Sequence, residues 1–420
     1  MAKHRAVNRL QNLTLLLLTL SALFLLSRLM LAGSGWTGLQ DLLPAGTAGG
    51  RPNQTMDLGE VMPAFHLVVT GDSEYGRYTQ LGAGGEDLQQ ILPLFQEALG
   101  SASVVGAAAD KTLQEALASP SLYLDLTVEL PSAVVAAWLG EGDSFGRNVR
   151  AMALAAEDEE SAFLYLRSDD GSIFRYNTAL PVSAVTEIAD SVSPNGGSFA
   201  YESNFAPLAP YTVLVAQPPE IPQLQGDIPA GYTAYNLLTA LDFNAHTNAR
   251  YPESDGTEVV VESPRLLRLS PDGEVTYVCD GETTSTLYRV PCAGESPTAV
   301  EAVQAAGNLA AVLTESTAAS PLYLRTLTPY ENGYRITFGY QAEGVPVFFP
   351  SDAPGLAVNI SGTAITSFVY RCRSYTAEEE MESMMPSEMA VAIASLGPGS
   401  GLSVGYVDNG TEVAARWLPR

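Results

Sequence analysis

Hydrophobic residues fall into two kinds of pattern along this chain. Near the start they form an almost unbroken run, and beyond residue 60 they alternate with polar residues or recur at helical spacing. Alternation predicts strands that bury one face, and recurrence every three to four residues predicts amphipathic helices. We therefore expect the α+β class: a single N-terminal transmembrane helix, followed by two or three extracytoplasmic domains of antiparallel sheet with packed helices.

Strands are predicted wherever the alternation is sustained, and two of the hairpin turns have clear turn chemistry, DDG at 169–171 and SPDG at 270–273. The predicted strands are 65–69, 122–130, 162–168, 172–180, 258–263, 264–270, 274–279, 321–328, 333–341, 345–349, 355–361, 364–374, 402–409 and 411–417. The predicted helices are 86–99, 111–119 with Asp110 as a cap, 133–140, 235–241, 298–313 and 386–396.

Composition shifts divide the chain. Residues 33–60 are rich in glycine without periodicity, which is typical of a linker, and the proline-rich stretch QPPEIPQLQG at 217–226 predicts a break between domains. The predicted organisation is a cytoplasmic tip and anchor at 1–36, a linker at 37–60, an α+β domain at 61–216, a second at 227–316 and a third at 317–420.

Two stretches have the same order of strand, small polar turn and strand. They are LLRLSPDGEVTYV at 266–278 and LAVNISGTAITSFVY at 356–370, and a helix follows each after an interval. This order is consistent with a duplicated unit in which a helix packs across an antiparallel sheet. Two unrelated hairpins would give the same pattern, so both interpretations stay open.

The apolar run at residues 13–32 has the length that a helix needs to cross a bilayer core, and 11 of its 20 residues are leucine. At about −0.5 kcal/mol per central leucine, insertion is favoured by several kcal/mol. Lys3, Arg5 and Arg9 precede the run, which places the N-terminus in the cytoplasm and the bulk of the chain outside. The predicted anchor residues are Leu13, Leu15, Leu16, Leu17, Leu18, Leu20, Leu23, Phe24, Leu25, Leu26, Leu29 and Leu31.

A cleaved signal peptide is the alternative for the same run, because small residues at 32–34 offer a plausible cleavage position. The leucine-rich stretch is longer than the usual apolar region of a signal peptide, which favours the uncleaved anchor.

The net charge of the chain limits the classes of molecule that it can bind. Its formal net charge is −26, so it would repel nucleic-acid phosphates, and we predict no nucleic-acid partner. Hydrophobic residues make up 46% of the chain, which excludes disorder throughout. Lysine occurs twice and histidine three times, so catalysis that needs either has few places to occur.

The cysteines are Cys279, Cys292 and Cys372. The first two flank a short turn-rich stretch and could form a disulfide outside the cytoplasm, although three isolated thiols are the alternative. With the histidines, these residues give no zinc-ligand spacing, and no phosphate loop or EF-hand spacing is present, so we predict no metal and no cofactor.

Other motifs give weak support for catalysis. GLSVG at 401–405 fits the nucleophile motif G-x-S-x-G, but no histidine follows Ser403 and the segment resembles a strand. We interpret His66 and His246 as structural or surface residues; an enzyme would need one of them in a cleft beside carboxylates. The acidic runs at 157–160 and 378–380 predict solvated turns or helix starts. The protein is therefore predicted to be non-enzymatic, with no catalytic residue.

Three features resemble the YycH/YycI family, membrane-anchored regulators of an essential cell-wall sensor kinase in Gram-positive bacteria. The first is the short basic N-terminus before a single span. The second is the succession GYRITFGY at 333–340, VPVF at 345–348 and LAVNI at 356–360 with Gly362. The third is a Met/Ala-rich helix at 386–396, then VGY at 404–406 and a terminal strand ending on Trp417.

The resemblance implies a non-enzymatic regulator that contacts a membrane sensor histidine kinase, and possibly a paralogous single-span regulator, partly through the lipid bilayer. The alternative is a tethered extracytoplasmic binding or propeptide/inhibitor-like module unrelated to kinase signalling. In either case we expect Tyr334, Phe338, Tyr340 and Phe348 to form the core of the last domain.

Overall fold

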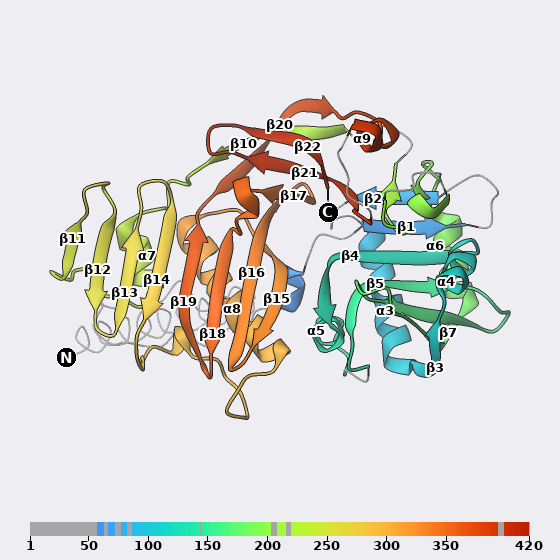
Figure 1. Cartoon of the computed structure of the whole chain (residues 1–420), viewed down its shortest axis with the longest axis horizontal. Helices are drawn as coiled ribbons and strands as arrows, with labels where there is room; N and C mark the ends of the chain where they lie inside the picture. Colours follow the sequence, from blue (N-terminus) through green and yellow to red (C-terminus); the bar gives the residue numbers. More distant parts are fainter. Residues whose placement is uncertain are drawn as a thin grey trace, which may run out of the picture. The chain divides into compact units, whose positions relative to one another are not determined.

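The structure, a computed structural model, describes residues 57–62, 66–71, 77–81, 86–142, 145–202, 208–215, 220–393 and 399–419. They belong to one compact unit built on two large, mostly antiparallel sheets with packed helices (Figure 1). The α+β class is thereby confirmed. The predicted span and all of its anchor residues lie outside the described residues. Among the helices that are described, none has the length and apolarity needed to cross a bilayer.

The first sheet has seven strands in the order β2-β1-β4-β5-β6-β7-β3, and every neighbouring pair is antiparallel. Its apolar side chains alternate between two faces, so helices cover both. One face packs on α3, α5 and α6, and the other on α4 and the short pair β8/β9. The elements are β1 (His66–Thr70), β2 (Arg77–Leu81), α3 (Glu86–Ser101), β3 (Ser103–Ala108), α4 (Asp110–Leu117), β4 (Ser121–Pro131), α5 (Ser132–Trp138), β5 (Asn148–Ala155), β6 (Ser161–Arg167), β7 (Ile173–Pro181), α6 (Val182–Ser191), β8 (Ser198–Phe199), η2 (Ala200–Glu202) and β9 (Val213–Leu214).

The second sheet has eleven strands in the order β11-β12-β13-β14-β19-β18-β16-β17-β21-β22, with β15 paired to β16. Only β17 and β21 are parallel among these described pairs. The sheet takes strands from both predicted ranges, 227–316 and 317–420. Its elements are α7 (Ala234–Ala240), β11 (Arg250–Pro252), β12 (Glu258–Glu262), β13 (Arg265–Leu269), β14 (Glu274–Cys279), η3 (Thr286–Tyr288), α8 (Ala299–Thr317), β15 (Leu322–Tyr330), β16 (Gly333–Ala342), β17 (Val345–Phe348), η4 (Pro350–Asp352), β18 (Leu356–Ser361), β19 (Ala364–Arg371), β21 (Leu402–Asp408) and β22 (Val413–Pro419).

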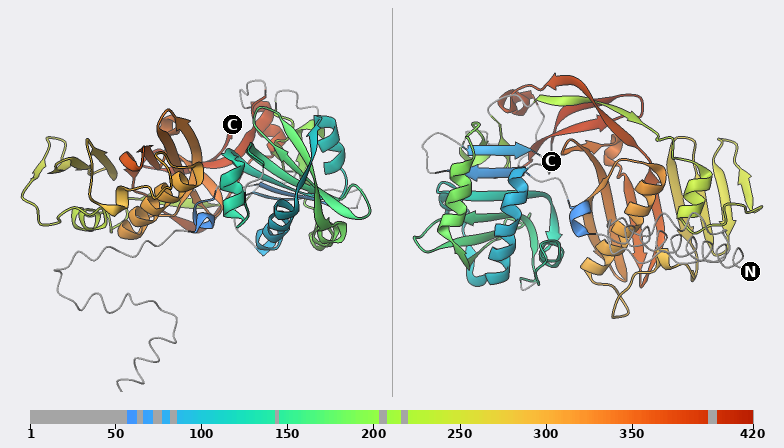
Figure 2. Two further views of the ribbon diagram at one scale, coloured as in Figure 1. Left: turned by 90° about the horizontal axis from the view of Figure 1, so that it is seen from below. Right: turned by 180° about the vertical axis from the view of Figure 1, so that it is seen from behind.

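Helices α7 and α8 lie on one face of the eleven-stranded sheet, as the view from behind in Figure 2 shows. The two hairpins that suggested a repeat, β13/β14 and β18/β19, are neighbours in this sheet and are joined by the antiparallel pair β14/β19. A further two-stranded sheet joins β10 (Glu220–Asp227) to β20 (Ser374–Ser383), and α9 (Ser387–Ile393) follows β20.

The long helix α8 begins where its sequence predicts. The Thr298 side chain accepts a hydrogen bond from the backbone N–H of Glu301 at 3.3 Å, and the Glu301 carboxylate accepts one from the backbone N–H of Thr298 at 2.7 Å. This capping box satisfies two backbone donors that the first turn leaves free. The helix then buries a row of small and aliphatic residues, among them Leu309 and Leu313, and ends at Ala318 in the left-handed conformation.

The core of the eleven-stranded sheet follows the alternation of β16. Phe338 and Tyr340 are fully buried, as predicted. Tyr334 packs against the core while only partly buried, and Phe348 is also partly buried, with the Arg325 guanidinium over its ring. Tyr334 and Phe348 therefore lie at the margin of the core, and the prediction that they form part of it is only partly correct.

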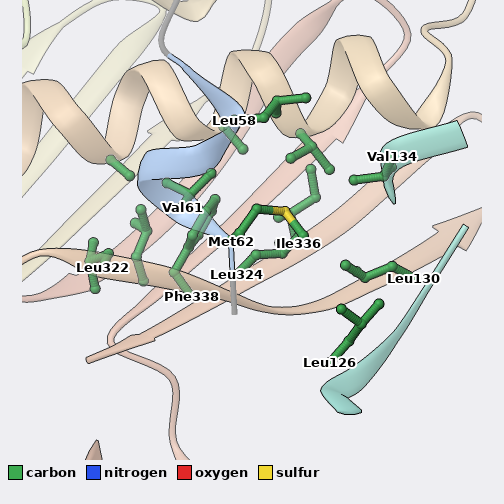
Figure 3. Close-up of a cluster of buried hydrophobic side chains, with 14 of the residues drawn as sticks. Leu58, Val61, Met62, Leu126, Leu130, Val134, Leu322, Leu324, Ile336 and Phe338 are labelled. Carbon is green, nitrogen blue, oxygen red and sulfur yellow. The ribbon is translucent and has the colours of Figure 1, made fainter. Parts of the chain in front are cut away.

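The first described segment packs where the apolar cores of the two sheets meet. The short helix η1 (Leu58–Val61) and the adjacent Met62 bury Leu58, Val61 and Met62. Their buried cluster includes Leu126, Leu130 and Val134 from β4 and α5, and Leu322, Leu324, Ile336 and Phe338 from β15 and β16 (Figure 3). We call these ten residues the junction.

Some elements differ from the prediction. Residues 378–380 lie in β20 and not in a turn or a helix start. β20 pairs with β10 on both sides of them, at Ala377 and at Met381, and the register shifts at the three glutamates themselves. The predicted break at 217–226 contains β10 from Glu220 onward. The strand β5 and the helix α6 were not predicted at all. By contrast, residues 157–160 do lie in the connection between β5 and β6.

Candidate functional site

The clearest candidate site is a pocket of about 310 Å³ on the face of the seven-stranded sheet that α4 and β8/β9 cover. Neighbouring strands of the sheet and the two segments around Ser400 and Tyr211 line it, and it is open to solvent. The two segments are joined by a hydrogen bond from the backbone N–H of Ala209 to the carbonyl of Ser400 at 2.9 Å. Its lining residues are His66, Asp125, Arg150, Arg167, Asp169, Ala209, Pro210, Tyr211, Thr212, Val213, Gly399, Gly401 and Leu402.

His66 and Asp125 lie opposite each other in the pocket because β1 and β4 pair in that register. Each is about 7% exposed. The Asp125 carboxylate accepts a hydrogen bond from the backbone N–H of Thr127 at 2.7 Å, and Thr127 itself has positive φ at an irregular point of β4. Strand pairing thus places a histidine and a carboxylate side by side on a mostly buried surface.

Arg150 joins the two carboxylates of the pocket. Its Nε donates to Asp125 at 2.9 Å and its Nη1 to Asp169 at 3.2 Å. Burial acts to lower the pKa of Arg150, but the charge of Asp125 and the hydrogen bond to it outweigh that effect and raise the pKa above its ordinary value. Arg150 is therefore a permanently charged centre held by two counter-charges.

Arg167, one strand further along the sheet, has a different environment. Its guanidinium lies 4.9 Å from the centroid of the Tyr211 ring, and its Nη2 is 3.4 Å from the Tyr123 hydroxyl. Its Nε is buried without a hydrogen-bond partner. Burial acts to lower the pKa of Arg167, but its interaction with Tyr123 and the charge of Asp125 outweigh that effect and raise the pKa above its ordinary value. Burial raises the pKa of Tyr123 to about 12, so that phenol is neutral at neutral pH and does not cancel the Arg167 charge.

Aromatic rings pack against this arginine and against one another. Tyr211 stacks on Tyr123 at 6.3 Å between centroids, and Phe199 meets Tyr123 edge-on at 5.2 Å. The Tyr211 hydroxyl donates to the Asp110 carboxylate at 3.0 Å, which fixes the ring at the start of α4. The guanidinium is therefore held in place by packing and cation–π contact.

The residues singled out from the sequence are scattered. His66 lines the pocket opposite Asp125, which is a histidine and a carboxylate of the kind that the enzymatic alternative required. His246 is exposed, and its ring centroid lies 6.2 Å from that of Tyr235. Ser403 lies in β21, as the strand pattern predicted; its buried hydroxyl has no hydrogen-bond partner, and it is not among the residues that line the pocket.

The three cysteines are free thiols, so the disulfide alternative is not formed. The Cys279 thiol donates to the carbonyl of Gly281 at 3.3 Å. Within the part of the chain that the structure describes, no group of three His, Cys, Asp or Glu side chains is placed to hold a metal ion.

The sequence analysis did not single out Asp125, Arg150 or Arg167 as site residues, and it considered Asp169 only as part of a turn and Gly401 and Leu402 only as part of the GLSVG motif. Asp125 and Arg150 each interrupt an apolar stretch of a strand (LYLDL and VRAMAL), and Arg167 ends one (FLYLR); a charge at such a position is a signal that could have been used. No pattern in the sequence indicates that the segments at 209–213 and 399–402 meet at the same strands.

Comparison of the chain with protein-family models, with curated proteins and with solved structures found no match.

Proposed function

We propose that the protein is a non-enzymatic, membrane-anchored extracytoplasmic regulator that contacts a sensor histidine kinase of a cell-wall two-component system, as the resemblance to the YycH/YycI family implies. The predicted basic tip and leucine-rich span anchor it, with the described residues outside. The proposal needs a surface suited to protein contact, and one observation on the eleven-stranded sheet supports it.

Three aliphatic side chains lie in a row on the solvent face of that sheet. Val261 pairs with Leu266, and Leu266 pairs with Val278, in the registers of β12, β13 and β14. Val261 is 38% exposed and Val278 is 44% exposed, and Leu266 is half-buried between them. We call these three residues the β12–β14 stripe.

Solvent-facing positions of a one-sided antiparallel sheet are usually polar. Neighbouring aliphatic side chains on three strands therefore favour a surface that a partner covers. The face that carries the stripe is opposite α7 and α8, so a partner would bind without displacing either helix.

The junction supports the same proposal. The chain that follows the predicted span enters the protein at η1, where the cores of both sheets meet. The predicted span, which a membrane partner would contact, is therefore separated by only a short stretch of sequence from residues that pack against both sheets. In a simple tether, no such packing of the entry segment is needed.

The experiment is site-specific photo-crosslinking in living cells from position 278. We expect a crosslinked product that contains a membrane sensor histidine kinase. The matched control carries the crosslinker at Val104, which is 64% exposed on β3 of the other sheet and should give no such product.

A second variant tests the chemistry of the stripe. V261T/V278T keeps the β-branched shape that suits a strand and removes apolar surface, so the fold should persist while the kinase crosslink weakens. If position 278 gives no kinase product, the contact proposal is wrong; a product with an unrelated extracytoplasmic protein would instead favour the tethered binding module.

A further inference from the structure

The stretch that runs from the end of β20 into α9 concentrates the methionines of the protein. Six methionines lie among the described residues, and four of them fall within residues 381–389. Figure 1 shows β20 and the helix α9 that follows it. We call residues 381–389 the methionine segment. A thioether side chain is apolar and is usually buried, so several exposed ones at a single place are unusual.

Three of the four side chains in the methionine segment are open to solvent. The exposed fraction is 50% for Met381, 42% for Met385 and 54% for Met389. Met384, which directly precedes Met385, is only 8% exposed and packs in the main hydrophobic core. The described methionines outside the segment are buried as well. Burial therefore divides the methionines into an exposed set of three and a protected set.

From these exposures we propose that the methionine segment is a modification site, at which a peroxide oxidises Met381, Met385 and Met389 to methionine sulfoxide while the buried methionines stay reduced. The proposal goes beyond the kinase contact, which involves the β12–β14 stripe on another sheet, so either can fail alone.

The reaction is an oxygen transfer to sulfur. A lone pair of the thioether sulfur attacks one oxygen of hydrogen peroxide, and the O–O bond breaks as the S–O bond forms. The departing hydroxide takes up the proton that the transferred oxygen loses, which gives the sulfoxide and water. Sulfur is oxidised by two electrons, and the peroxide is reduced. The step needs no protein base, so access of the peroxide to the sulfur decides which methionines react.

The charge around the methionine segment favours a neutral oxidant. Glu378, Glu379 and Glu380 directly precede Met381 and are exposed. The whole chain has a net charge of −26, so it repels anionic oxidants. Hydrogen peroxide is uncharged at neutral pH and is not repelled. We therefore expect a neutral peroxide to be the oxidant that reaches the exposed sulfurs.

The contacts that hold the methionine segment in place do not use the three exposed thioethers. The carbonyl of Met385 accepts a hydrogen bond from the indole N–H of Trp417 at 2.9 Å, and the Ser387 hydroxyl donates to the carbonyl of Val215 at 2.8 Å. Helix α9 also contributes two aliphatic residues to a buried cluster. Oxidation makes an apolar side chain polar, so at these positions it changes the polarity of the surface and leaves the fold intact.

The test is treatment of the purified full chain in detergent with hydrogen peroxide, followed by peptide mapping with tandem mass spectrometry. Each sulfoxide adds the mass of one oxygen atom, so the rate at every methionine is measured separately. We expect the three exposed residues to react at least about fivefold faster than Met384, in line with exposed fractions of 42% or more against 8%.

Met384 is the matched control, because it is adjacent to Met385 in the sequence and differs from it in burial. In concentrated urea, where the chain is unfolded, the same treatment should oxidise all four residues at similar rates. The variant M381L/M385L/M389L keeps apolar side chains of similar volume and removes the three thioethers. The methionine segment of the native variant should then gain almost no oxygen over the same period.

Three results would overturn the proposal. The first is an equal rate at Met384 and at the three exposed residues in the native protein, because burial would then not select the site. The second is no oxidation of the exposed residues under conditions that oxidise free methionine. The third is loss of the native circular dichroism spectrum as these residues are oxidised, which would make the reaction damage to the fold and not a surface modification.

Discussion

Replacing Met62 with alanine tests whether the segment after the predicted anchor is part of the folded core. Met62 is 4% exposed and lies in the junction, among side chains of both large sheets. The substitution removes three side-chain heavy atoms from this cluster. If η1 only rests on the surface, their loss will matter little; if it joins the two cores, the loss will destabilise the whole unit.

The expected magnitude follows from burial. Burying a methionine side chain contributes about 1.5–3 kcal/mol, and the cavity left behind adds to the cost, so buried Met→Ala changes fall at about 2–5 kcal/mol. Because η1 is a single short helix near the end of the described unit, partial relaxation should limit the loss. We expect the free energy of unfolding to fall by about 2–3 kcal/mol.

The assay is urea denaturation of the full chain in detergent, followed by circular dichroism. The control is V104A, at a position 64% exposed on β3, which should change the free energy of unfolding by less than about 0.5 kcal/mol. A loss for M62A no larger than that of V104A would refute the packing argument. So would a separate early transition for η1 with the main transition unchanged.

Other predictions follow from single features of the structure. T298A removes the side chain that caps α8 and should cost about 1 kcal/mol in urea denaturation, within the usual range for caps; no loss would mean that the capping box does not stabilise the helix. Burial raises the pKa of Tyr123 to about 12 from its ordinary value of 10.0, so the folded state holds this proton more tightly than the unfolded state; its contribution is complete below pH 10 and is lost as the pH rises toward 12. The free energy of unfolding should therefore fall between pH 10 and 12, with a shallower fall in Y123F, and an identical fall in both proteins would contradict the assignment. In a thiol titration with a chromogenic disulfide reagent, Cys292 should react in the native protein, whereas the buried Cys279 and Cys372 should react only after unfolding; a total of one thiol in the unfolded protein would mean that a disulfide had formed.

Much of the fold could be predicted because local patterns and tertiary packing agree. The alternation LYLDLTVEL marks β4, and the turn SPDG joins β13 to β14 as expected. The helix α8 combines a capping box with small and aliphatic residues at helical spacing. At such positions propensity, pattern and turn chemistry indicate the same structure.

Other elements could not be predicted because their partners are distant in the sequence. The strand β20 carries consecutive glutamates, and the residues on both sides of them pair with β10, about 150 residues earlier along the chain (Ser374 opposite Asp227 in register). The strand β5, NVRAMALA, is exposed only at Asn148 and continues as small and apolar residues that are buried on both faces, so its sequence shows no alternation.

The pocket depended on the same kind of long-range contact. His66 was considered from the sequence, but its neighbour Asp125 became visible only with the register of β1 and β4. The guanidinium of Arg167 packs against the ring of Tyr211, and the segment that carries Tyr211 has no recognisable sequence motif. A site whose residues are brought together by strand register and by irregular segments cannot be predicted from local sequence patterns.

The most direct test of the proposed function exchanges the predicted span. Three strains would carry the native chain, a chain whose residues 13–32 are replaced by an unrelated leucine-rich span, and a secreted fragment from residue 57 onward. The output of the cell-wall two-component system would be measured by a transcriptional reporter. Contact with the kinase through both the span and the exported part predicts that the exchanged span alters the output and that the secreted fragment does not restore it. Equal output in all three strains would contradict the account.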